Sequence, residues 1–330
     1  MKTIVTGGAG FIGSHLVKKL VKLGRKVIVI DDFSSGSIEN LNSLGIKKSK
    51  IEIRKIDLTN FKETKKALRG GNIIFHLAAR IGGLTYLHSA EDAELLALTE
   101  NLAIDANVFK ACLENGVKKI IYTSSTAVYP YNKQKKLGTV FNEKDFQIDS
   151  YQLCFDPDGG YGLSKIMGEF QLNLIKKIEI GIARLFNIYG ENEPIDQKAH
   201  AICDLAKKAI HYPKEKFIVW GNGNQTRDYL YVEDCVGALI KIEEKISHSS
   251  PLILNIGSGK ATPIKEIAEK MILFSGKKIK PTFDLKKPVG PISRTADIEK
   301  AKTILNWQPK ISLERGLKRT FIWIQKKLND

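Results

Sequence analysis

The chain opens with Met1-Lys-Thr-Ile-Val-Thr6-Gly7-Gly-Ala-Gly10-Phe11-Ile12-Gly13-Ser-His15. The β-branched run at residues 3–6 predicts a buried strand, and the apolar spacing over residues 11–20 predicts an amphipathic helix. The glycines between them have the spacing GxxGxxG. A glycine turn between a strand and a helix indicates a dinucleotide site, because the helix N-terminus offers unpaired N–H groups to phosphate.

The glycines and the next strand define the expected cofactor. Gly7 allows a tight turn, Gly10 lets the backbone approach a pyrophosphate, and Gly13 lets the helix pack on the strand. The strand predicted at 26–30 ends in two aspartates, about twenty residues after the glycines, where a carboxylate binds the adenosine ribose hydroxyls. Because Asp31 repels a 2′-phosphate, the sequence predicts NAD rather than NADP. The cofactor-binding residues expected here are Gly7, Gly10, Phe11, Ile12, Gly13, Asp31 and Asp32.

Strands and helices alternate through the first half of the chain. Further strands are predicted at 51–56, 72–77 and 118–123, a long helix at about 90–114, and another helix after Tyr161. This alternation predicts an α/β fold with a Rossmann-type, doubly wound parallel sheet that binds ligands at the carboxyl ends of its strands. On the long helix we expect one buried apolar stripe, formed by Leu95, Leu98, Leu102, Ala106, Phe109 and Leu113.

The pattern loosens after about residue 180. A strand at 181–186, a helix at 232–245 and an amphipathic helix at 313–328 are still predicted, among short strands and turns rich in glycine and proline. We therefore expect an NAD-binding Rossmann domain at 1–180, with elements around 226–250 returning to it. Residues 181–330 are expected to form mainly a smaller C-terminal α/β lobe that binds the substrate and closes over a cleft.

The composition argues against a membrane protein, a secreted protein, a metalloprotein and a nucleic-acid-binding protein. The sequence contains no run of about eighteen apolar residues, so no membrane span is predicted. The N-terminus lacks a signal-peptide pattern. Isolated cysteines favour a cytoplasmic location, and scattered histidines argue against a metal site. The net charge of +16 comes mostly from lysines spread over every amphipathic segment. Since no aromatic residues interleave with them, we expect a solvated surface that binds neither nucleic acid nor membrane.

Two short motifs carry the expected chemistry. Ser124 and Ser125 end the predicted fifth strand, where a nicotinamide ring is expected, and Tyr161-Gly-Leu-Ser-Lys165 follows downstream. On a helix, Tyr161 and Lys165 share one face, one turn apart. A neighbouring ammonium favours the phenolate, so Tyr161 could act as a base near neutrality while Ser125 orients the substrate hydroxyl. Hydride would leave the same carbon for NAD.

Together these motifs resemble those of the extended short-chain dehydrogenases/reductases, the nucleotide-sugar epimerases and dehydratases. The resemblance covers essentially the whole chain. It implies a catalytic triad of Ser125, Tyr161 and Lys165, with Tyr161 and Lys165 also contacting a tightly held NAD. It further implies a homodimer formed by two helices from each subunit. The cofactor contacts that it adds are Asp57, Leu58, Leu77, Ala78 and Ala79.

The resemblance extends into the second half of the chain, where it implies binding of a nucleotide-diphosphate sugar. Asn187, in Phe186-Asn187-Ile-Tyr-Gly190, matches an asparagine that contacts the substrate diphosphate. Arg227 and Arg294 match two arginines that bind phosphate. Two arginines suit a diphosphate because each guanidinium donates hydrogen bonds in pairs.

Within the family, several segments are similar to the GDP-mannose 3,5-epimerase subgroup. They include Gly82-Gly83-Leu-Thr-Tyr86, which adds Gly82 and Gly83 to the expected substrate contacts, and Gln197-Lys198-Ala199. That subgroup uses a cysteine and a lysine as an acid/base pair. Lys198 matches the lysine, a catalytic and substrate-binding role, but Ala127 stands where the cysteine would be. Cys154 or Cys203 could replace this cysteine, although each is better interpreted as a small buried apolar residue.

Chemistry alone favours a simpler reaction. A 4-epimerase needs only Tyr161, Ser125, NAD and room for the 4-keto sugar to turn, and every part is present. A 4,6-dehydratase needs an Asp-Glu pair where this chain has Thr126-Ala127. A reductase of the same fold would release NADPH, which Asp31 opposes, and a non-catalytic NAD-binding protein would not need an intact triad. The nucleotide base, the sugar and the inverted carbon stay open from the sequence.

Overall fold

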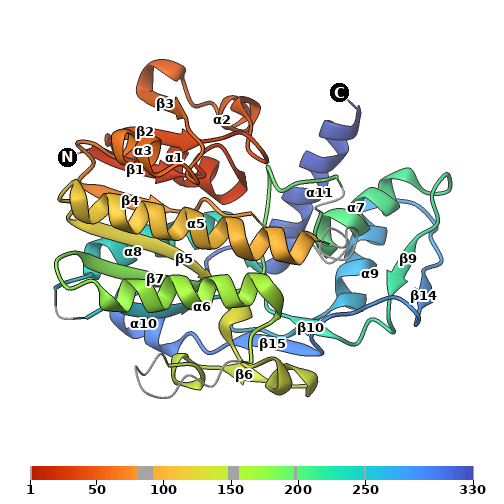
Figure 1. Cartoon of the computed structure of the whole chain (residues 1–330). Helices are drawn as coiled ribbons and strands as arrows, with labels where there is room; N and C mark the ends of the chain where they lie inside the picture. Colours follow the sequence, from red (N-terminus) through yellow and green to blue (C-terminus); the bar gives the residue numbers. More distant parts are fainter. Residues whose placement is uncertain (1, 81–91, 148–155, 197–198, 249, 330) are drawn as a thin grey trace.

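The computed structural model describes residues 2–80, 92–147, 156–196, 199–248 and 250–329. A parallel sheet of seven strands lies at the centre of its larger part, in the order β12-β7-β5-β4-β1-β2-β3 (Figure 1). The strands are β1 (Lys2–Thr6), β2 (Lys26–Asp31), β3 (Ile51–Lys55), β4 (Ile73–His76), β5 (Lys119–Ser125), β7 (Glu179–Leu185) and β12 (Leu252–Ile256). The order reverses beside β1, as in the doubly wound folds that bind dinucleotides there.

Alternating side chains along the strands build a core on each face of this sheet. In β1, Val5 joins the core under one helical layer and Ile4 joins the core under the other; both are fully buried. A strand that is buried on both faces reads as a continuous β-branched run, which is why residues 3–6 and 27–30 are recognisable in the sequence.

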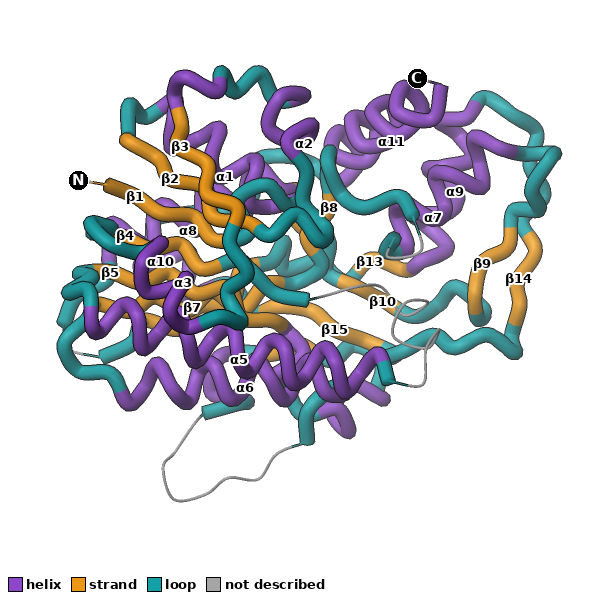
Figure 2. The backbone as a smooth tube through the Cα atoms, turned by 45° about the horizontal axis from the view of Figure 1, so that its top comes forward, coloured by secondary structure: helices purple, strands orange, loops and turns teal. Residues whose placement is uncertain are grey.

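Helices cover the two faces of the sheet (Figure 2). One layer comprises α1 (Phe11–Lys22), α8 (Val232–Lys245) and α10 (Glu299–Leu305), with α2 (Ile38–Ser43) packed beside α1. The other comprises α3 (Phe61–Ala67), α5 (Ala93–Glu114) and α6 (Gly159–Leu174). The helix predicted at 232–245 therefore returns to the sheet.

Of the predicted apolar stripe of the long helix, Phe109 is buried in the core at 3% exposed, but the stripe as a whole does not face the sheet. Leu95 and Leu113 are 58% and 45% exposed, whereas Asn101 and Asp105 are each 1% exposed. The buried face of α5 consists largely of small residues together with these two polar ones, because α5 packs closely against α6 and the sheet. Hydrophobic periodicity assumes that polar residues face solvent, and α5 buries two of them in hydrogen bonds instead.

A smaller lobe stands beside the carboxyl ends of the strands (Figure 1). Its core lies among α7 (Ala201–His211), α9 (Ile264–Ser275) and α11 (Leu313–Asn329). A sheet in the order β13-β10-β15-β6 crosses between the lobe and the larger part. The remaining strands are β6 (Val140–Phe141), β8 (Ile188–Tyr189), β9 (Ile218–Trp220), β10 (Thr226–Arg227), β11 (Leu230–Tyr231), β13 (Thr262–Pro263), β14 (Thr282–Asp284) and β15 (Ser293–Ala296).

The expected domain boundary at residue 180 falls inside β7, so the central sheet draws on more of the chain than 1–180. β7 and β12 complete this sheet at one edge. The helices of the lobe come from the chain between these two strands and from the chain after β12. Within the described residues no helix combines the length and the apolar character needed to cross a membrane.

Candidate active site

A cavity of about 810 Å³ lies between the carboxyl ends of the sheet strands and the lobe. Its volume is in the range of cofactor and substrate sites. One end is lined by the turn after β1, the ends of β2 and β4 and the segment after β3; the other end is lined by α7, β9 and residues of β10 and β15. Ser125, Tyr161 and Lys165 also line it, so the predicted cofactor and substrate residues share one continuous space.

The glycine turn between β1 and α1 has no room for side chains at two positions. Gly7 has φ +66°, and a Cβ atom on Gly13 would stand 2.0 Å from the carbonyl oxygen of Gly7. Gly10 differs, since a Cβ atom there would meet only the Gly7 oxygen, at 3.2 Å. Beyond it is the cavity, so the backbone at the start of α1 can contact a ligand directly. The first-turn amides of α1 have no carbonyl partner within the helix and can bind a phosphate.

Asp31 is fixed at the carboxyl end of β2 beside this turn. It is 6% exposed, and its carboxylate accepts hydrogen bonds from the amides of Ala9 and Phe33, both at 2.9 Å. Burial raises the pKa of Asp31, although the hydrogen bonds from the backbone oppose this. Asp32 instead holds the following turn, accepting from the amide and hydroxyl of Ser34 at 2.9 and 2.7 Å.

The remaining predicted cofactor residues also line the cavity. They are Phe11, Ile12, Asp57, Leu58, Leu77, Ala78 and Ala79. Asp57 accepts hydrogen bonds from the amide and hydroxyl of Thr59, at 2.9 and 2.8 Å, which shapes the turn after β3. The hydroxyl of Thr6 accepts from the amides of Leu77 and Ala78, at 3.2 and 3.3 Å, and so ties the end of β4 to the glycine turn.

The catalytic candidates come from β5 and α6. Ser125 ends β5, and its hydroxyl accepts a hydrogen bond from the amide of Ala127 at 3.1 Å. Tyr161 and Lys165 lie one turn apart on α6, with the Lys165 ammonium 5.9 Å from the centroid of the Tyr161 ring. The Tyr161 hydroxyl is hydrogen-bonded to Ser125. The structure therefore brings the three residues together.

Burial sets the protonation of this cluster. It raises the pKa of Tyr161, an effect that the hydrogen bond to Ser125 opposes and the nearby charge of Asp105 reinforces. It lowers the pKa of Lys165, while the negative charges of Asp105 and Glu169 act in the other direction. Positive charge placed beside Tyr161 is therefore what would make its phenolate accessible near neutral pH.

Two arginines face the other end of the cavity from neighbouring strands. Arg227 in β10 is paired in register with Arg294 in β15, so their side chains start about 5 Å apart. Arg294 is paired with Asp158 and donates to Gln134 at 2.7 Å. Within the described ranges, Arg227 donates only to backbone carbonyl oxygens, those of Thr226, Pro291 and Val289.

Arg227 therefore carries a charge that no carboxylate of the described residues neutralises. Burial, helped by the charge of Arg294, lowers the pKa of Arg227 to about 10. Such a site favours a bound anion. Asn187, with φ +31°, lines the same space and donates from its side chain to the carbonyl of Asp228 at 3.3 Å.

Sequence reasoning missed one titratable pair on the cavity wall. Glu193 is 2% exposed and pairs with His200 Nδ1 at 3.0 Å, while its Oε2 atom has no partner in the described part of the chain. The His200 side chain is 49% exposed because it faces the cavity. Burial lowers the pKa of His200, but the hydrogen bond and charge of Glu193 more than offset this and raise it overall. The two residues precede α7 and lie in no helix or strand, so no periodic pattern marks them.

Several predicted residues lie outside the described part of the chain, namely Gly82, Gly83, Lys198 and Cys154. The other candidate for a replacement acid, Cys203, is fully buried on α7, and burial raises the pKa of its thiol. Ala127, which lines the cavity next to Ser125, offers no proton.

A doubly wound sheet with a glycine turn, an acid at the end of β2 and a Ser–Tyr–Lys cluster defines a dinucleotide-dependent enzyme of the short-chain dehydrogenase/reductase type. Comparison with known families makes this specific: residues 3–257 match the model of the NAD dependent epimerase/dehydratase family. The chain belongs to that family, and NAD is its cofactor. The Gly10 approach to the cavity and the buried Asp31 carboxylate fit this cofactor.

Individual relatives extend over nearly the whole chain. It is 31% identical to a putative UDP-glucose 4-epimerase of Methanocaldococcus jannaschii, over 98% of both chains. It is 28% identical to the GDP-mannose 3,5-epimerase of Arabidopsis thaliana, over 99% of this chain and 83% of that protein. A UDP-glucose 4-epimerase of Thermotoga maritima, solved with UDP-glucose, has a TM-score of 0.85 at 26% identity, over 99% of this chain and 100% of that one.

Proposed function

We propose that this chain is a nucleotide-sugar 4-epimerase that oxidises C4 of a nucleotide-linked hexose transiently and reduces it again from the other face. The observation that carries the proposal is one cavity that combines the Ser125–Tyr161–Lys165 cluster with Arg227, which has no carboxylate partner among the residues that the structure describes. The first can remove a proton from a hydroxyl, and the second can bind a diphosphate. A nucleotide sugar carries both groups.

The diphosphate is assigned to Arg227, Arg294 and Asn187. A bound anion should stabilise Arg227 more than Arg294, because the hydrogen bonds of Arg227 to the described residues go to neutral carbonyl groups. Arg294 has Asp158 as its partner, so a diphosphate would share or displace that contact. This assignment leaves the sugar to extend from the arginines toward Tyr161.

The chemical step is assigned to the residues of β5 and α6. Tyr161 takes the proton of the sugar C4 hydroxyl, and Ser125, already bonded to Tyr161, orients that hydroxyl. The ammonium of Lys165 stabilises the phenolate that Tyr161 must form. When bound, NAD supplies the acceptor and donor of hydride. After the 4-keto sugar has turned and hydride has returned to the other face of C4, Tyr161 gives its proton back to the C4 oxygen, which completes the inversion without a further acid.

The nucleotide is proposed to be UDP, with GDP as the alternative. Support for UDP comes from the Methanocaldococcus relative, which is named a putative UDP-glucose 4-epimerase, and from the Thermotoga structure, which contains UDP-glucose. Support for GDP comes from the Arabidopsis relative, which is named a GDP-mannose 3,5-epimerase.

A 3,5-epimerase mechanism is the second candidate. It would use Lys198 to exchange protons at the carbons beside a C4 ketone and needs a partner acid. Ala127 lacks one, and burial keeps the thiol of Cys203 protonated. A 4,6-dehydratase is weaker still, because Thr126 and Ala127 follow Ser125 where acids would be needed.

Product analysis tests the proposal. The purified protein is incubated with UDP-glucose, UDP-galactose, UDP-N-acetylglucosamine, UDP-glucuronate and GDP-mannose, and the products are separated by anion-exchange chromatography and identified by NMR. We expect the C4 epimer of one UDP-sugar and no product from Tyr161→Phe. A 3,5-epimer of GDP-mannose would favour the second candidate, and a 4-keto-6-deoxy product would contradict both.

The homodimer and the cytoplasmic location expected from the sequence stay predictions. Leu95, Leu96 and Leu113 on α5 and Leu174 at the end of α6 are each at least 45% exposed, and the two helices pack side by side. These exposed leucines are consistent with a partner covering the two helices, which sedimentation equilibrium would detect.

A further inference from the structure

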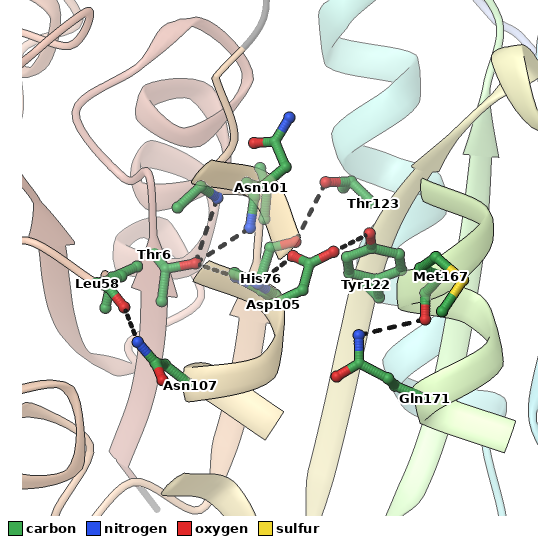
Figure 3. Close-up of polar contacts among 12 residues, drawn as sticks. Thr6, Leu58, His76, Asn101, Asp105, Asn107, Tyr122, Thr123, Met167 and Gln171 are labelled. Carbon is green, nitrogen blue, oxygen red and sulfur yellow. Dashed lines mark hydrogen bonds and ion pairs between the residues drawn. The ribbon is translucent and has the colours of Figure 1, made fainter. Parts of the chain in front are cut away.

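A buried polar network runs from Thr6 at the end of β1 through His76 and Asp105 to Tyr122 of β5 (Figure 3). Asp105 on α5 is 1% exposed and lies between His76 of β4 and Tyr122 of β5. Its carboxylate oxygens are 3.0 Å from His76 Nε2 and 2.6 Å from the Tyr122 hydroxyl. On its other ring nitrogen, His76 is 2.6 Å from the hydroxyl of Thr6. No step of the proposed reaction uses this carboxylate.

Donors and acceptors along the network fix its protons. The hydroxyl of Thr6 already accepts hydrogen bonds from the amides of Leu77 and Ala78, so its own hydrogen points to His76 Nδ1. His76 therefore carries its proton on Nε2 and donates it to Asp105. Tyr122 donates to the other oxygen of Asp105. Both oxygens of Asp105 are thus bonded, one to the His76 ring and the other to the Tyr122 hydroxyl, and no lysine or arginine of the described residues pairs with this carboxylate.

Lys165 is a buried lysine on which the charge of Asp105 acts. Its ammonium lies 4.5 Å from the centroid of the Tyr122 ring, whose hydroxyl is bonded to Asp105. Lys165 is 1% exposed and forms no ion pair within the described part of the chain. Gly168, one turn further along α6, leaves no room for a side chain, since a Cβ atom there would stand 2.6 Å from Asp105 Oδ2. The carboxylate is therefore packed directly against the catalytic helix.

The other acid near Lys165 is already neutralised. Glu169 on α6 pairs with Arg184 of β7 at 2.7 Å, with both side chains fully buried, and accepts from Ser124 at 2.5 Å. The titratable groups that face Lys165 are thus Tyr161 and Glu169 from its own helix, Tyr122 from β5 and Asp105 from α5, with His76 behind Asp105. Of the two acids among them, Glu169 is paired with Arg184, whereas no lysine or arginine of the described residues pairs with Asp105.

We propose that Asp105 is a positioning residue for Lys165: it supplies the buried negative charge that keeps this lysine an ammonium beside Tyr161. His76 and Thr6 hold Asp105 in place and connect it to the turn that binds the cofactor. The inference rests on the proposed function only for its effect on catalysis, because the charge state of Lys165 can be measured without a substrate.

The direction of the effect follows from charge. Removing a negative charge makes Lys165 lose its proton more easily and makes the phenolate of Tyr161 form more easily, so both pKa values fall. The active form needs Tyr161 deprotonated and Lys165 protonated. In a plot of rate against pH, the acid limb therefore reports the pKa of Tyr161 and the alkaline limb reports the pKa of Lys165. Loss of the charge moves both limbs to lower pH, whereas a purely structural defect lowers the rate at every pH and leaves the limbs in place.

The test replaces Asp105 in the holoprotein. Asp105→Asn removes the charge at nearly constant shape, and Asp105→Ser removes it with a smaller hydrogen-bonding side chain, so the test does not depend on one variant folding. Tyr122→Phe is the matched control, because it removes a hydrogen bond to Asp105 and keeps the charge. The titration of Lys165 is followed by NMR of lysine labelled with ¹³C at Cε, and its resonance is identified by its loss in Lys165→Met.

We expect the Lys165 titration to move to lower pH by on the order of one unit in either charge-removing variant and to stay in place in Tyr122→Phe. With UDP-glucose as probe, both limbs of the pH profile should move in the same sense. A Lys165 titration unchanged in Asp105→Asn or Asp105→Ser would overturn the proposal, whether or not UDP-glucose is turned over. Failure of all sugars to react would instead count against the proposed function alone.

Discussion

Replacing Arg227 with methionine tests how the cavity binds a diphosphate. Burial and the neighbouring Arg294 lower the pKa of Arg227 to about 10. The difference from its ordinary value corresponds to about 3 kcal/mol of unfavourable burial of the charge. An anion bound at Arg227 relieves this cost. Arg227→Met removes the relief, so affinity for a nucleoside diphosphate should fall by about 100-fold, at about 1.4 kcal/mol per factor of ten.

Isothermal titration calorimetry with UDP, GDP and UDP-glucose measures this loss. Arg315→Met is the matched control, because Arg315 is exposed on α11, is absent from the cavity lining and carries the same charge. We expect the control to bind within threefold of the parent chain. At a given ligand concentration, stabilisation of the folded state by ligand should also shrink in Arg227→Met, since it depends on the ratio of ligand concentration to dissociation constant. If Arg227→Met binds every diphosphate as tightly as the parent, the assignment of this arginine is refuted.

Three further predictions concern the chemistry, the turn and the cavity wall. Tyr161→Phe should lower turnover by about a thousandfold or more while the NAD content, measured by mass spectrometry, stays unchanged. Gly13→Ala should cost about 3 kcal/mol or more in urea unfolding, because its Cβ atom would stand 2.0 Å from a carbonyl oxygen; Gly237→Ala on α8, where a Cβ atom would make only one ordinary contact at 3.8 Å, should gain about 1 kcal/mol. The pKa of His200 is raised in the folded state, so its pair with Glu193 stabilises the protein fully below the ordinary histidine pKa and loses this effect as pH rises above it. The difference in Tm between the parent and Glu193→Gln should therefore shrink from pH 6 upward, and a difference independent of pH would contradict the assignment.

The parts of the fold and site that rest on local sequence were predictable. The glycine turn, Asp31, and Tyr161 with Lys165 each depend on spacing within one strand–turn–helix unit or one helix, and the structure places them along one cavity. The helix at 232–245 was predicted with the bounds that α8 has. Such elements carry a strong periodic signal and terminate at recognisable residues.

The parts that depend on tertiary contacts were not predictable. The burial of Asn101 and Asp105 on α5 was not predicted, because no sequence pattern indicates that Asp105 contacts His76 and Tyr122 on two different strands. The pairing of Arg227 with Arg294 depends on the register of two short strands far apart in the chain. The amphipathic helices α7 and α9 were overlooked, although their apolar spacing is present in the sequence.

The central claim is that hydride leaves and returns at C4 and that no carbon–hydrogen bond of the sugar exchanges with solvent. Proton NMR of the product formed from UDP-glucose or another accepted sugar in heavy water tests this most directly. The account predicts a C4 epimer that contains no deuterium. Deuterium at C3 or C5 of an epimerised sugar would contradict it and would mean that an acid/base pair exchanges protons beside the C4 ketone.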